Sequence, residues 1–384
     1  MIDYFKTTVG EEEILAVSET MRGGWLTTGN KCSLFEESFL NKFEFDSSFN
    51  AIAVGANTHG LHLALDAFNF NKNAEVIVPS MTFTASASSI LMSGLKPVIV
   101  DTNEENLITA EIIKKAITHN TVAIMVVHFA GNTPDMDEIM NLAESYNLKV
   151  IEDAAHALPS KYHNGEWVGS YGNPTIFSFY ANKTMTTGEG GMVISNDAEL
   201  NNLIKIKRSH GMNKNVLDRF SGNPQNWEYD ISCKGYKYNL TDIASSIGII
   251  QLEKSFYGQK SREKIASRYR KNFQDTDIIM TAEASKNGQH AYHLFQVRSK
   301  YNPEQFRYNL TTEFDKKNIG YSVHYKPLHK LSFWKKFVDS KASFINSDNH
   351  FSGCISLPIY PDLSISDVDI ISDVVLDVYS RVGN

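Results

Sequence analysis

Short apolar runs alternate with helical patterns through the first half of the chain. The helical patterns are clearest at 109–117 and 136–146, where apolar residues recur every three or four positions. The apolar runs occupy residues 50–55, 75–80, 96–101, 122–129, 148–153, 176–180 and 192–194. Runs that are apolar on both faces indicate strands buried from both sides, as in a mostly parallel sheet between helices. We therefore predict an α/β fold.

Two further helices are predicted on either side of this region. Residues 10–22 place glutamates before apolar residues at helical spacing, which favours a helix whose first turn complements the helix dipole. A longer helical pattern follows Asp242, with isoleucines on one stripe at Ile243, Ile247, Ile250 and Ile265. A helix of this length near the two-thirds point of a chain is suited to joining two domains.

The last third of the chain differs in composition, being more basic and poorer in glycine from about residue 256. Strand signals return at 294–297 and 320–324, and 368–379 has the pattern of an amphipathic helix. We predict a large domain over residues 1–250 and a smaller α+β domain over residues 251–384.

Composition excludes several classes of protein. The 384-residue chain is 42% hydrophobic and 21% charged, as expected of a globular protein, and its net charge of −7 argues against nucleic acid or an anionic membrane as a partner. Cys32, Cys233 and Cys354 are too widely spaced for a disulfide framework or a zinc site, so no metal is predicted. Without an apolar signal core or a run of membrane length, the expected location is the cytoplasm.

The turn after the first apolar run predicts a phosphate site. Residues 55–60 read Gly-Ala-Asn-Thr-His-Gly, between a strand and a helix that opens near Thr58. A helix N-terminus presents free backbone N–H groups and a partial positive charge, and Asn57 lies beside it. Small residues also occur in ordinary turns, so this motif is weak by itself.

Lys183 and Asp153 are the candidate catalytic groups. Lys183 follows the apolar run that contains Ser178 and precedes a glycine-rich turn; burial there would lower its pKa and make the amine a nucleophile toward an aldehyde. The alternative is an ordinary surface lysine. Asp153 ends an apolar strand, where it could cap a helix or act as the counter-charge of a cationic ring nitrogen. With Phe83 as a flat aromatic and the phosphate turn, these groups describe pyridoxal 5′-phosphate.

Two irregular segments remain. Residues 23–29 contain Trp25 and Thr28 in a glycine-rich loop, which could present an aromatic face and a hydroxyl to a ligand or simply bury a tryptophan beside a turn. Residues 213–234 are polar and irregular, and we interpret them as an ordered excursion or a flap.

The order of these motifs resembles the DegT/StrS-type sugar aminotransferases over nearly the whole chain. The resemblance rests on Ile151-Glu152-Asp153-Ala154-Ala155-His156-Ala157, on Phe177-Ser178-Phe179 followed by Lys183, and on Gly188-Glu189-Gly190-Gly191. Further matching blocks lie at 24–29, 79–83, 128–131, 235–242 and 357–361. Each motif alone is weak, but their ordered combination is specific.

This resemblance implies the aspartate-aminotransferase type I fold and a homodimer with active sites shared between subunits. Lys183 would bond the cofactor and move a proton, Asp153 would pair with the pyridinium, Phe83 would stack on the ring, and His156 would lie near the ring hydroxyl. Asn57, Thr58 and Ser178 would hold the phosphate. From the neighbouring subunit, Lys237 or Asn239 would reach the cofactor; the family commonly has Gly-x-Asn-x-Arg there, whereas this chain has the cation and the amide exchanged.

The resemblance further implies transfer of the amino group of L-glutamate to the 4-keto carbon of a nucleotide-linked sugar, for a cell-surface polysaccharide or lipopolysaccharide. The amino-acid sequence of residues 235–242 and 320–329 most resembles the branch of the family that makes 4-amino-4-deoxy-L-arabinose on a uridine nucleotide. Trp25, Thr28, His324 and His329 are the expected sugar-nucleotide contacts, although loop histidines are often merely solvated.

Four other functions are compatible with parts of this pattern or differ from it at a single motif. A 3-keto-sugar aminotransferase and a non-catalytic cofactor-binding regulator use the same fold. A sugar 3-dehydratase of this fold has histidine in place of the lysine, so Lys183 argues against it. A nicotinamide dehydrogenase would need Gly-x-Gly-x-x-Gly at its first strand–helix turn, and the chain lacks that motif there.

Overall fold

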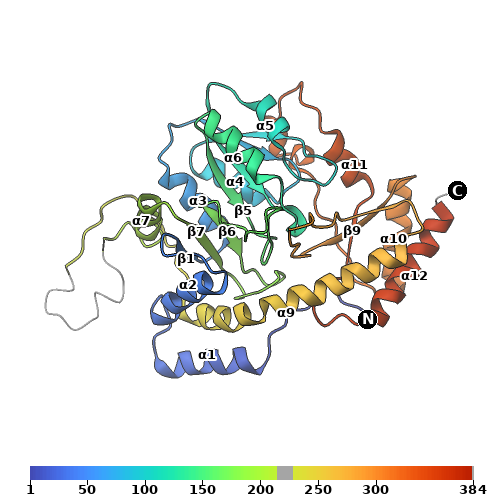
Figure 1. The fold of residues 1–384 in the computed structure, drawn as a ribbon, viewed down its shortest axis with the longest axis horizontal. Coiled ribbons are helices and arrows are strands. Elements are labelled where there is room, and N and C mark those ends of the chain that lie inside the picture. The colour runs from blue at the N-terminus through green and yellow to red at the C-terminus, as the bar shows by residue number, and fades with distance from the viewer. Residues whose placement is uncertain (214–227, 383–384) are drawn as a thin grey trace.

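The computed structural model describes residues 1–213 and 228–382, which form a large mixed sheet and a small antiparallel one (Figure 1). The strands of the large sheet lie in the order β1-β7-β6-β5-β4-β2-β3. Their bounds are β1 Asn50–Val54, β2 Glu75–Pro79, β3 Lys96–Val100, β4 Thr121–Val127, β5 Lys149–Asp153, β6 Thr175–Ser178 and β7 Gly191–Ser195. Every apolar run named above is therefore a strand, and the predicted α/β fold is confirmed.

Parallel pairing runs from β3 through β2, β4 and β5 to β6, whereas β7 is antiparallel to both of its neighbours. The carboxyl ends of β4, β5 and β6 consequently meet at one edge of the sheet. In sheets of this kind ligands bind outside those carboxyl ends.

Both faces of the large sheet are buried, as continuous apolar strands require. In β1, Ala51 and Ala53 join one hydrophobic cluster while Ile52 and Val54 join the other. The first face is covered by α2 (Asn30–Lys42), α5 (Ala110–Ala116) and α6 (Met136–Ser145). The second is covered by α3 (Asn57–Ala67), α4 (Thr84–Met92) and α7 (Ala198–Lys207).

Two glycines let the N-terminus of α3 approach the sheet closely. A Cβ atom at Gly191 would lie 2.9 Å from Ala56 C, Asn57 N and Phe177 O, all of them backbone atoms. A Cβ at Gly60 would lie 2.7 Å from Ile176 Cγ2. The start of α3 is thereby held against β6 and β7, at the edge where those strands reach the cavity described below.

A third hydrophobic cluster, called the small cluster below, lies around the small sheet. Its strands are β8 (Ile278–Met280), β9 (Phe295–Ser299) and β10 (Ile355–Leu357), and helices α10 (Pro303–Lys317) and α12 (Ile365–Val382) contribute to it. Helix α11 (Ile345–Gly353) packs beside α10 and β9. The strand predicted at 294–297 is β9, and the helix predicted at 368–379 lies within α12. Short 3₁₀ segments occur at η1 (Phe129–Gly131), η2 (Leu328–Lys330) and η3 (Trp334–Phe337).

The strand predicted at 320–324 is wrong. In this segment Ser322 forms an isolated bridge with Ser356, and no strand is present there. The carbonyl of His324 accepts a hydrogen bond from the Gln296 side chain at 2.7 Å, so a side chain takes the place of a ladder partner.

Helix α9 (Asp242–Phe273) runs below the large sheet in the view of Figure 1 and packs on α1 (Glu11–Gly23), α2 and α12. At about 1.5 Å per residue, its 32 residues span roughly 48 Å. The helices predicted at 10–22 and after Asp242 are confirmed as α1 and α9. The predicted domain boundary at 250/251 falls inside α9 and stays a prediction.

Within the described residues, no helix is both long and apolar enough to span a bilayer. Most of the irregular segment predicted at 213–234, namely residues 214–227, lies outside the described residues.

Candidate active site

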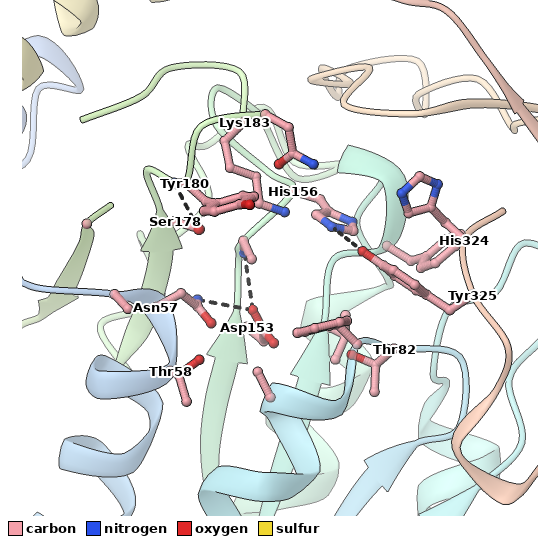
Figure 2. A pocket seen from close by; sticks show the side chains of 18 of the residues that line it. Asn57, Thr58, Thr82, Asp153, His156, Ser178, Tyr180, Lys183, His324 and Tyr325 are labelled. Atoms are coloured by element: carbon pink, nitrogen blue, oxygen red, sulfur yellow. Dashed lines mark hydrogen bonds between the residues drawn. The ribbon is translucent and has the colours of Figure 1, made fainter. Parts of the chain in front are cut away.

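A cavity of about 460 Å³ opens at the carboxyl ends of β4, β5 and β6 (Figure 2). It brings together residues that are far apart in the sequence, because the parallel strands deliver their ends to one edge. Most of the predicted cofactor residues line it, as does one predicted substrate residue: Asn57, Thr58, Phe83, Asp153, His156, Ser178, Lys183 and His324.

Lys183 extends into the cavity opposite Asp153 (Figure 2). Burial lowers the pKa of its ammonium group to about 8, and the nearby Asp153 carboxylate partly opposes that shift. Its Nζ lies 3.4 Å from Nε2 of His293. The pKa of His293 is itself held well below the usual range by burial. A sizeable fraction of the Lys183 amine is therefore neutral near pH 8, as a carbonyl nucleophile needs.

This pKa predicts a pH profile for cofactor uptake. The rate at which cofactor-free protein bonds an aldehyde cofactor should rise with pH through about 8 and then level off, because the neutral amine is the reactive form. An ordinary lysine would keep accelerating to about pH 10.4. Stopped-flow absorbance between pH 6 and 10 measures this rate. A rise without a plateau below pH 10 would contradict the buried environment.

Asp153 is a buried carboxylate supported by neutral donors. It is 5% exposed and accepts hydrogen bonds from Ser86 Oγ at 2.7 Å, Asn57 Nδ2 at 3.2 Å and the Ala155 backbone N–H at 3.2 Å. Burial raises the pKa of the carboxyl, and the Ser86 hydrogen bond is the largest opposing effect. A cation beside this carboxylate would favour its ionised form.

The N-terminus of α3 forms the opposite end of the cavity. Asn57 and Thr58 occupy its first turn, where backbone N–H groups lack acceptors within the helix. Ser178, at the end of β6, adds a hydroxyl to the same cavity wall. The phosphate site predicted from residues 55–60 thus has the expected geometry: a helix of 11 residues, held close by Gly60 and Gly191, with side-chain donors beside it.

An aromatic wall faces these groups. Phe83 is 59% exposed within a cavity, which leaves a ring face open, and its centroid lies 5.9 Å from that of Tyr325. His156 accepts from the Ala130 N–H at Nδ1 (3.3 Å), so its neutral ring carries the proton on Nε2, 3.1 Å from the Tyr325 hydroxyl. Burial, aided by the Lys183 ammonium, lowers the His156 pKa well below its usual range.

Sequence reasoning missed Ser86, His293 and Tyr325. Ser86 lies in α4, which was not predicted, and the other two belong to segments that approach the large sheet from the small cluster. No local pattern distinguishes them from other polar residues. Their positions depend on packing between segments 67 to 169 residues apart.

The remaining predicted residues lie outside the lining of this cavity. Trp25 donates through Nε1 to the Thr28 carbonyl at 3.1 Å, and the Thr28 hydroxyl accepts from Asn239 Nδ2. Lys237 is exposed on the same segment, which lies along β1 and α3.

His329 is held away from the cavity by its own contacts. Nδ1 lies 2.7 Å from Ser80 Oγ and Nε2 lies 2.8 Å from Asp348 Oδ1. Since both ring nitrogens have protein partners, its predicted role as a substrate contact stays a prediction. His324 lines the cavity, and its Nδ1 lies 2.8 Å from Ser356 Oγ.

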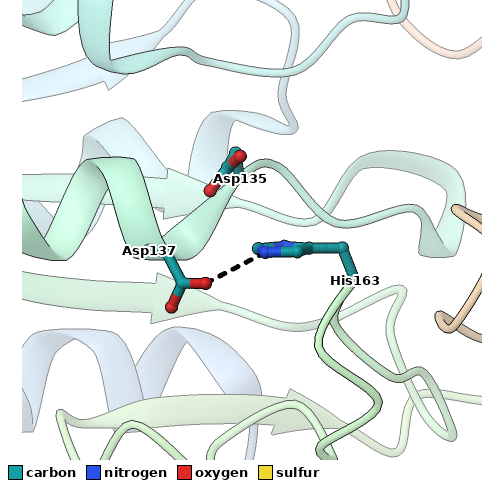
Figure 3. Close-up of side chains that lie close together, drawn as sticks. All are labelled: Asp135, Asp137 and His163. Carbon is teal, nitrogen blue, oxygen red and sulfur yellow. Dashed lines mark hydrogen bonds and ion pairs between the residues drawn. The ribbon is translucent and has the colours of Figure 1, made fainter.

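Within the described residues, Asp135, Asp137 and His163 have metal-ligand spacing, with ligand atoms within 4.8 Å of one another (Figure 3). Each already has a protein partner. Asp135 accepts from the Glu138 N–H at the start of α6, and Asp137 accepts from the Tyr171 hydroxyl and pairs with His163 at 3.0 Å. This exposed cluster is satisfied internally, and we assign no ion to it.

Comparisons with known proteins place the chain in a family. Residues 7–376 match the DegT/DnrJ/EryC1/StrS aminotransferase family, and the chain belongs to it. It is 43% identical to an uncharacterized protein of Methanocaldococcus jannaschii (95% of this chain, 94% of the relative) and 38% identical to the spore coat polysaccharide biosynthesis protein SpsC of Bacillus subtilis (98% and 97%). The structure is similar to the putative sugar aminotransferase Spr1654 of Streptococcus pneumoniae, with TM-score 0.92, 30% identity and full coverage of both chains.

The cofactor of this family fits the cavity, and it is pyridoxal 5′-phosphate. Asp153 offers a buried carboxylate. Among the described residues, its hydrogen-bond donors are all neutral, so its charge is available to a pyridinium. Asn57, Thr58 and Ser178 would hold the phosphate, Phe83 would cover the ring, and Lys183 would bond the aldehyde. The sheet is that of the type I aminotransferase fold, as predicted.

Proposed function

We propose that this protein transfers the amino group of L-glutamate to the 4-keto carbon of a nucleotide-linked sugar, within the biosynthesis of a surface polysaccharide. The observation that carries this proposal is the pairing of Lys183 with Asp153 across one cavity, each with a pKa shifted by burial. An amine poised near pH 8 opposite a buried carboxylate suits an enzyme better than a binding protein.

When bound, the cofactor supplies an electron sink for the carbon that gains or loses the amino group. Asp153 keeps the ring nitrogen protonated, since its ionised form is favoured by a cation at that position. Lys183 Nζ would accept and return the proton at the reacting carbon. His156 donates from Nε2 to the Tyr325 hydroxyl, which orients that hydroxyl toward the cavity wall.

The substrate class is supported by the relatives and by the space available. SpsC takes part in spore coat polysaccharide biosynthesis, and Spr1654 is a putative sugar aminotransferase. A cavity of about 460 Å³ has room for a sugar beside the cofactor. Within this class, the 4-amino-4-deoxy-L-arabinose branch stays a prediction from the sequence.

A half-reaction experiment tests the proposal. Purified protein is converted to the pyridoxamine form with L-glutamate, freed of excess donor, and offered UDP-, dTDP- and GDP-linked 4-keto sugars one at a time. Return of the visible cofactor absorbance with one sugar identifies the acceptor and its nucleotide. If glutamate removes the absorbance but only a 3-keto sugar restores it, the 3-keto-sugar alternative replaces the 4-keto proposal. If no amino donor changes the absorbance, the non-catalytic regulator is favoured.

We further propose a homodimer in which residues 235–242 complete the partner's site. Within one subunit Lys237 is exposed and Asn239 contacts Thr28, and neither residue lines the cofactor cavity of its own chain. The exposed apolar side chains of α1, including Ile14 and Leu15, support a covering subunit near this segment.

Shared sites predict complementation. Chains carrying Lys183→Ala and chains carrying Lys237→Ala with Asn239→Ala should each be weakly active or inactive. Each mixed dimer should regain roughly half of wild-type turnover, because one of its two sites is then intact. Activity is measured after unfolding and refolding the two chains together, with hybrids verified by differently tagged subunits. Verified hybrids without recovered activity would argue for self-contained sites.

A further inference from the structure

A second cavity, of about 190 Å³, lies between the loop that follows β3 of the large sheet and strands β8 and β9 of the small sheet. Phe129 is the residue that it shares with the lining of the cofactor cavity. One wall comes from the loop after β3, with Glu104, Glu105 and Asn106, and the other from β9 and α11, with Arg298 and His350. Nothing in the proposed transamination uses these polar groups.

Arg298 is the cation of this cavity. It is half-buried on β9, and no hydrogen bond or ion pair to it occurs among the described residues. Burial lowers the pKa of its guanidinium group, although not enough to discharge an arginine at neutral pH. A planar group with five N–H donors and no protein acceptor is suited to a carboxylate or phosphate.

His350 offers a second donor to the same cavity. It is 8% exposed, and its Nδ1 lies 3.0 Å from Asn106 Nδ2. Burial lowers its pKa to about 3, so the ring is neutral and, with Nδ1 accepting, carries its proton on Nε2. Nε2 is buried without a hydrogen-bond partner among the described residues. The His324 backbone carbonyl lies close enough to this ring to oppose the pKa shift, and it also accepts from the Gln296 side chain at 2.7 Å.

The loop after β3 provides acceptors. Asn106 is 6% exposed, and in the described structure its Oδ1 is buried without a partner. Glu104 and Glu105 are exposed at the rim, where Glu105 also accepts from Asn132 Nδ2 at 3.3 Å. One side of the cavity therefore donates and the other accepts.

The charges of the residues that line this cavity determine which class of ligand it can bind. Arg298 contributes one positive charge, Glu104 and Glu105 contribute two negative charges, and His350 is neutral, which disfavours a phosphate dianion or a dicarboxylate. A zwitterion satisfies both sides. We propose that this cavity binds a small α-amino acid, with its carboxylate on Arg298 and His350 Nε2 and its ammonium group facing Glu104, Glu105 and Asn106 Oδ1.

This site is distinct from the one where the amino donor reacts. Phe129 separates the two, with its ring 6.0 Å from that of His350 and 6.2 Å from that of Tyr325. An amino acid bound at Arg298 lies on the far side of this aromatic ring from the cofactor cavity.

Equilibrium dialysis on the pyridoxamine-loaded protein tests the proposal, because an amino donor cannot react again with that form. L-Serine, L-alanine and L-glutamine are the probes. We expect one saturable site per chain for at least one of them. Arg298→Met should weaken it about tenfold or more, as loss of a charge-assisted contact does. Lys300→Met, which removes an exposed cation just beyond β9, is the matched control and should leave binding unchanged.

Folding of each variant is checked by its melting temperature. If Arg298→Met is unstable, Glu104→Gln at the exposed rim serves instead and should also weaken binding. The proposal is overturned if none of the probes saturates, if the variants bind as the wild type does, or if inorganic phosphate or L-lactate binds there as tightly as the amino acids. Because binding alone is measured, failure of the transamination proposal would not alter any of these outcomes.

Discussion

Replacement of Lys183 by alanine should abolish turnover and remove the visible absorbance of the cofactor-loaded protein. Two functions disappear together, because the amine both bonds the cofactor and moves the proton at the reacting carbon. Loss of a positioned proton-transfer group alone costs up to about 10⁴-fold in rate, so the expected loss is at least of that order. Spectra of the loaded protein and the two half-reactions measure it.

Lys183→Arg is the matched control for charge. Arginine keeps a cation opposite Asp153 but does not deprotonate, so this variant should be as inactive as alanine. The melting temperature of the alanine variant should not fall, since burial of the ammonium group is unfavourable in the native protein. Turnover above a few per cent in either variant would refute the assignment of Lys183.

Asp153→Asn should slow both half-reactions by about 10²–10³-fold, the typical effect of removing one preorganised electrostatic contact. Asparagine has nearly the same shape: its Oδ1 can accept from Asn57 and the Ala155 N–H, and its Nδ2 can donate to the Ser86 hydroxyl, so the cavity should keep its form. Its neutral amide, however, gives no counter-charge to the pyridinium. Stopped-flow absorbance with glutamate measures the first half-reaction. Unchanged rates would mean that the ring nitrogen lies elsewhere.

In the cofactor-free protein, the Asp153→Asn substitution should increase the stability of the fold. Burial raises the Asp153 pKa above its unfolded value of about 3.9, so ionisation destabilises the native state once the pH exceeds that value. Cofactor-free Asp153→Asn should therefore melt at a higher temperature than the wild type at pH 7, and the difference should shrink as the pH falls toward about 4. Asp373→Asn, at an exposed carboxylate of α12, is the matched control.

The sheet was predictable because its strands are buried on both faces. Ile52 and Ala53 point to opposite clusters, yet both must be apolar, and this leaves an unbroken run in the sequence. The strand predicted at 320–324 does not form, because the backbone carbonyl of His324 accepts a hydrogen bond from the Gln296 side chain and not from a neighbouring strand. The antiparallel insertion of β7 between β1 and β6 has no local signature.

The candidate site was predictable where a residue follows a strand end or opens a helix, as Asp153 and Asn57 do. It was not predictable where packing alone brings a side chain in, as with Ser86 and His293. Arg298 belongs to this second group. On an isolated strand it would be taken as a solvated cation, and only the three-dimensional structure shows that its guanidinium group has no hydrogen-bond partner among the described residues.

Ile2 pairs with the chain beside Ile319: its N–H donates to the Asn318 carbonyl at 3.0 Å, and its carbonyl accepts from Gly320 at 2.7 Å. During synthesis at about 5–20 residues per second, these groups must wait many seconds for their partners to leave the ribosome. The strands up to β7 can pair long before that. The nascent chain should therefore assemble its large sheet first and close the small cluster last, with its earliest residues among the final ones to settle.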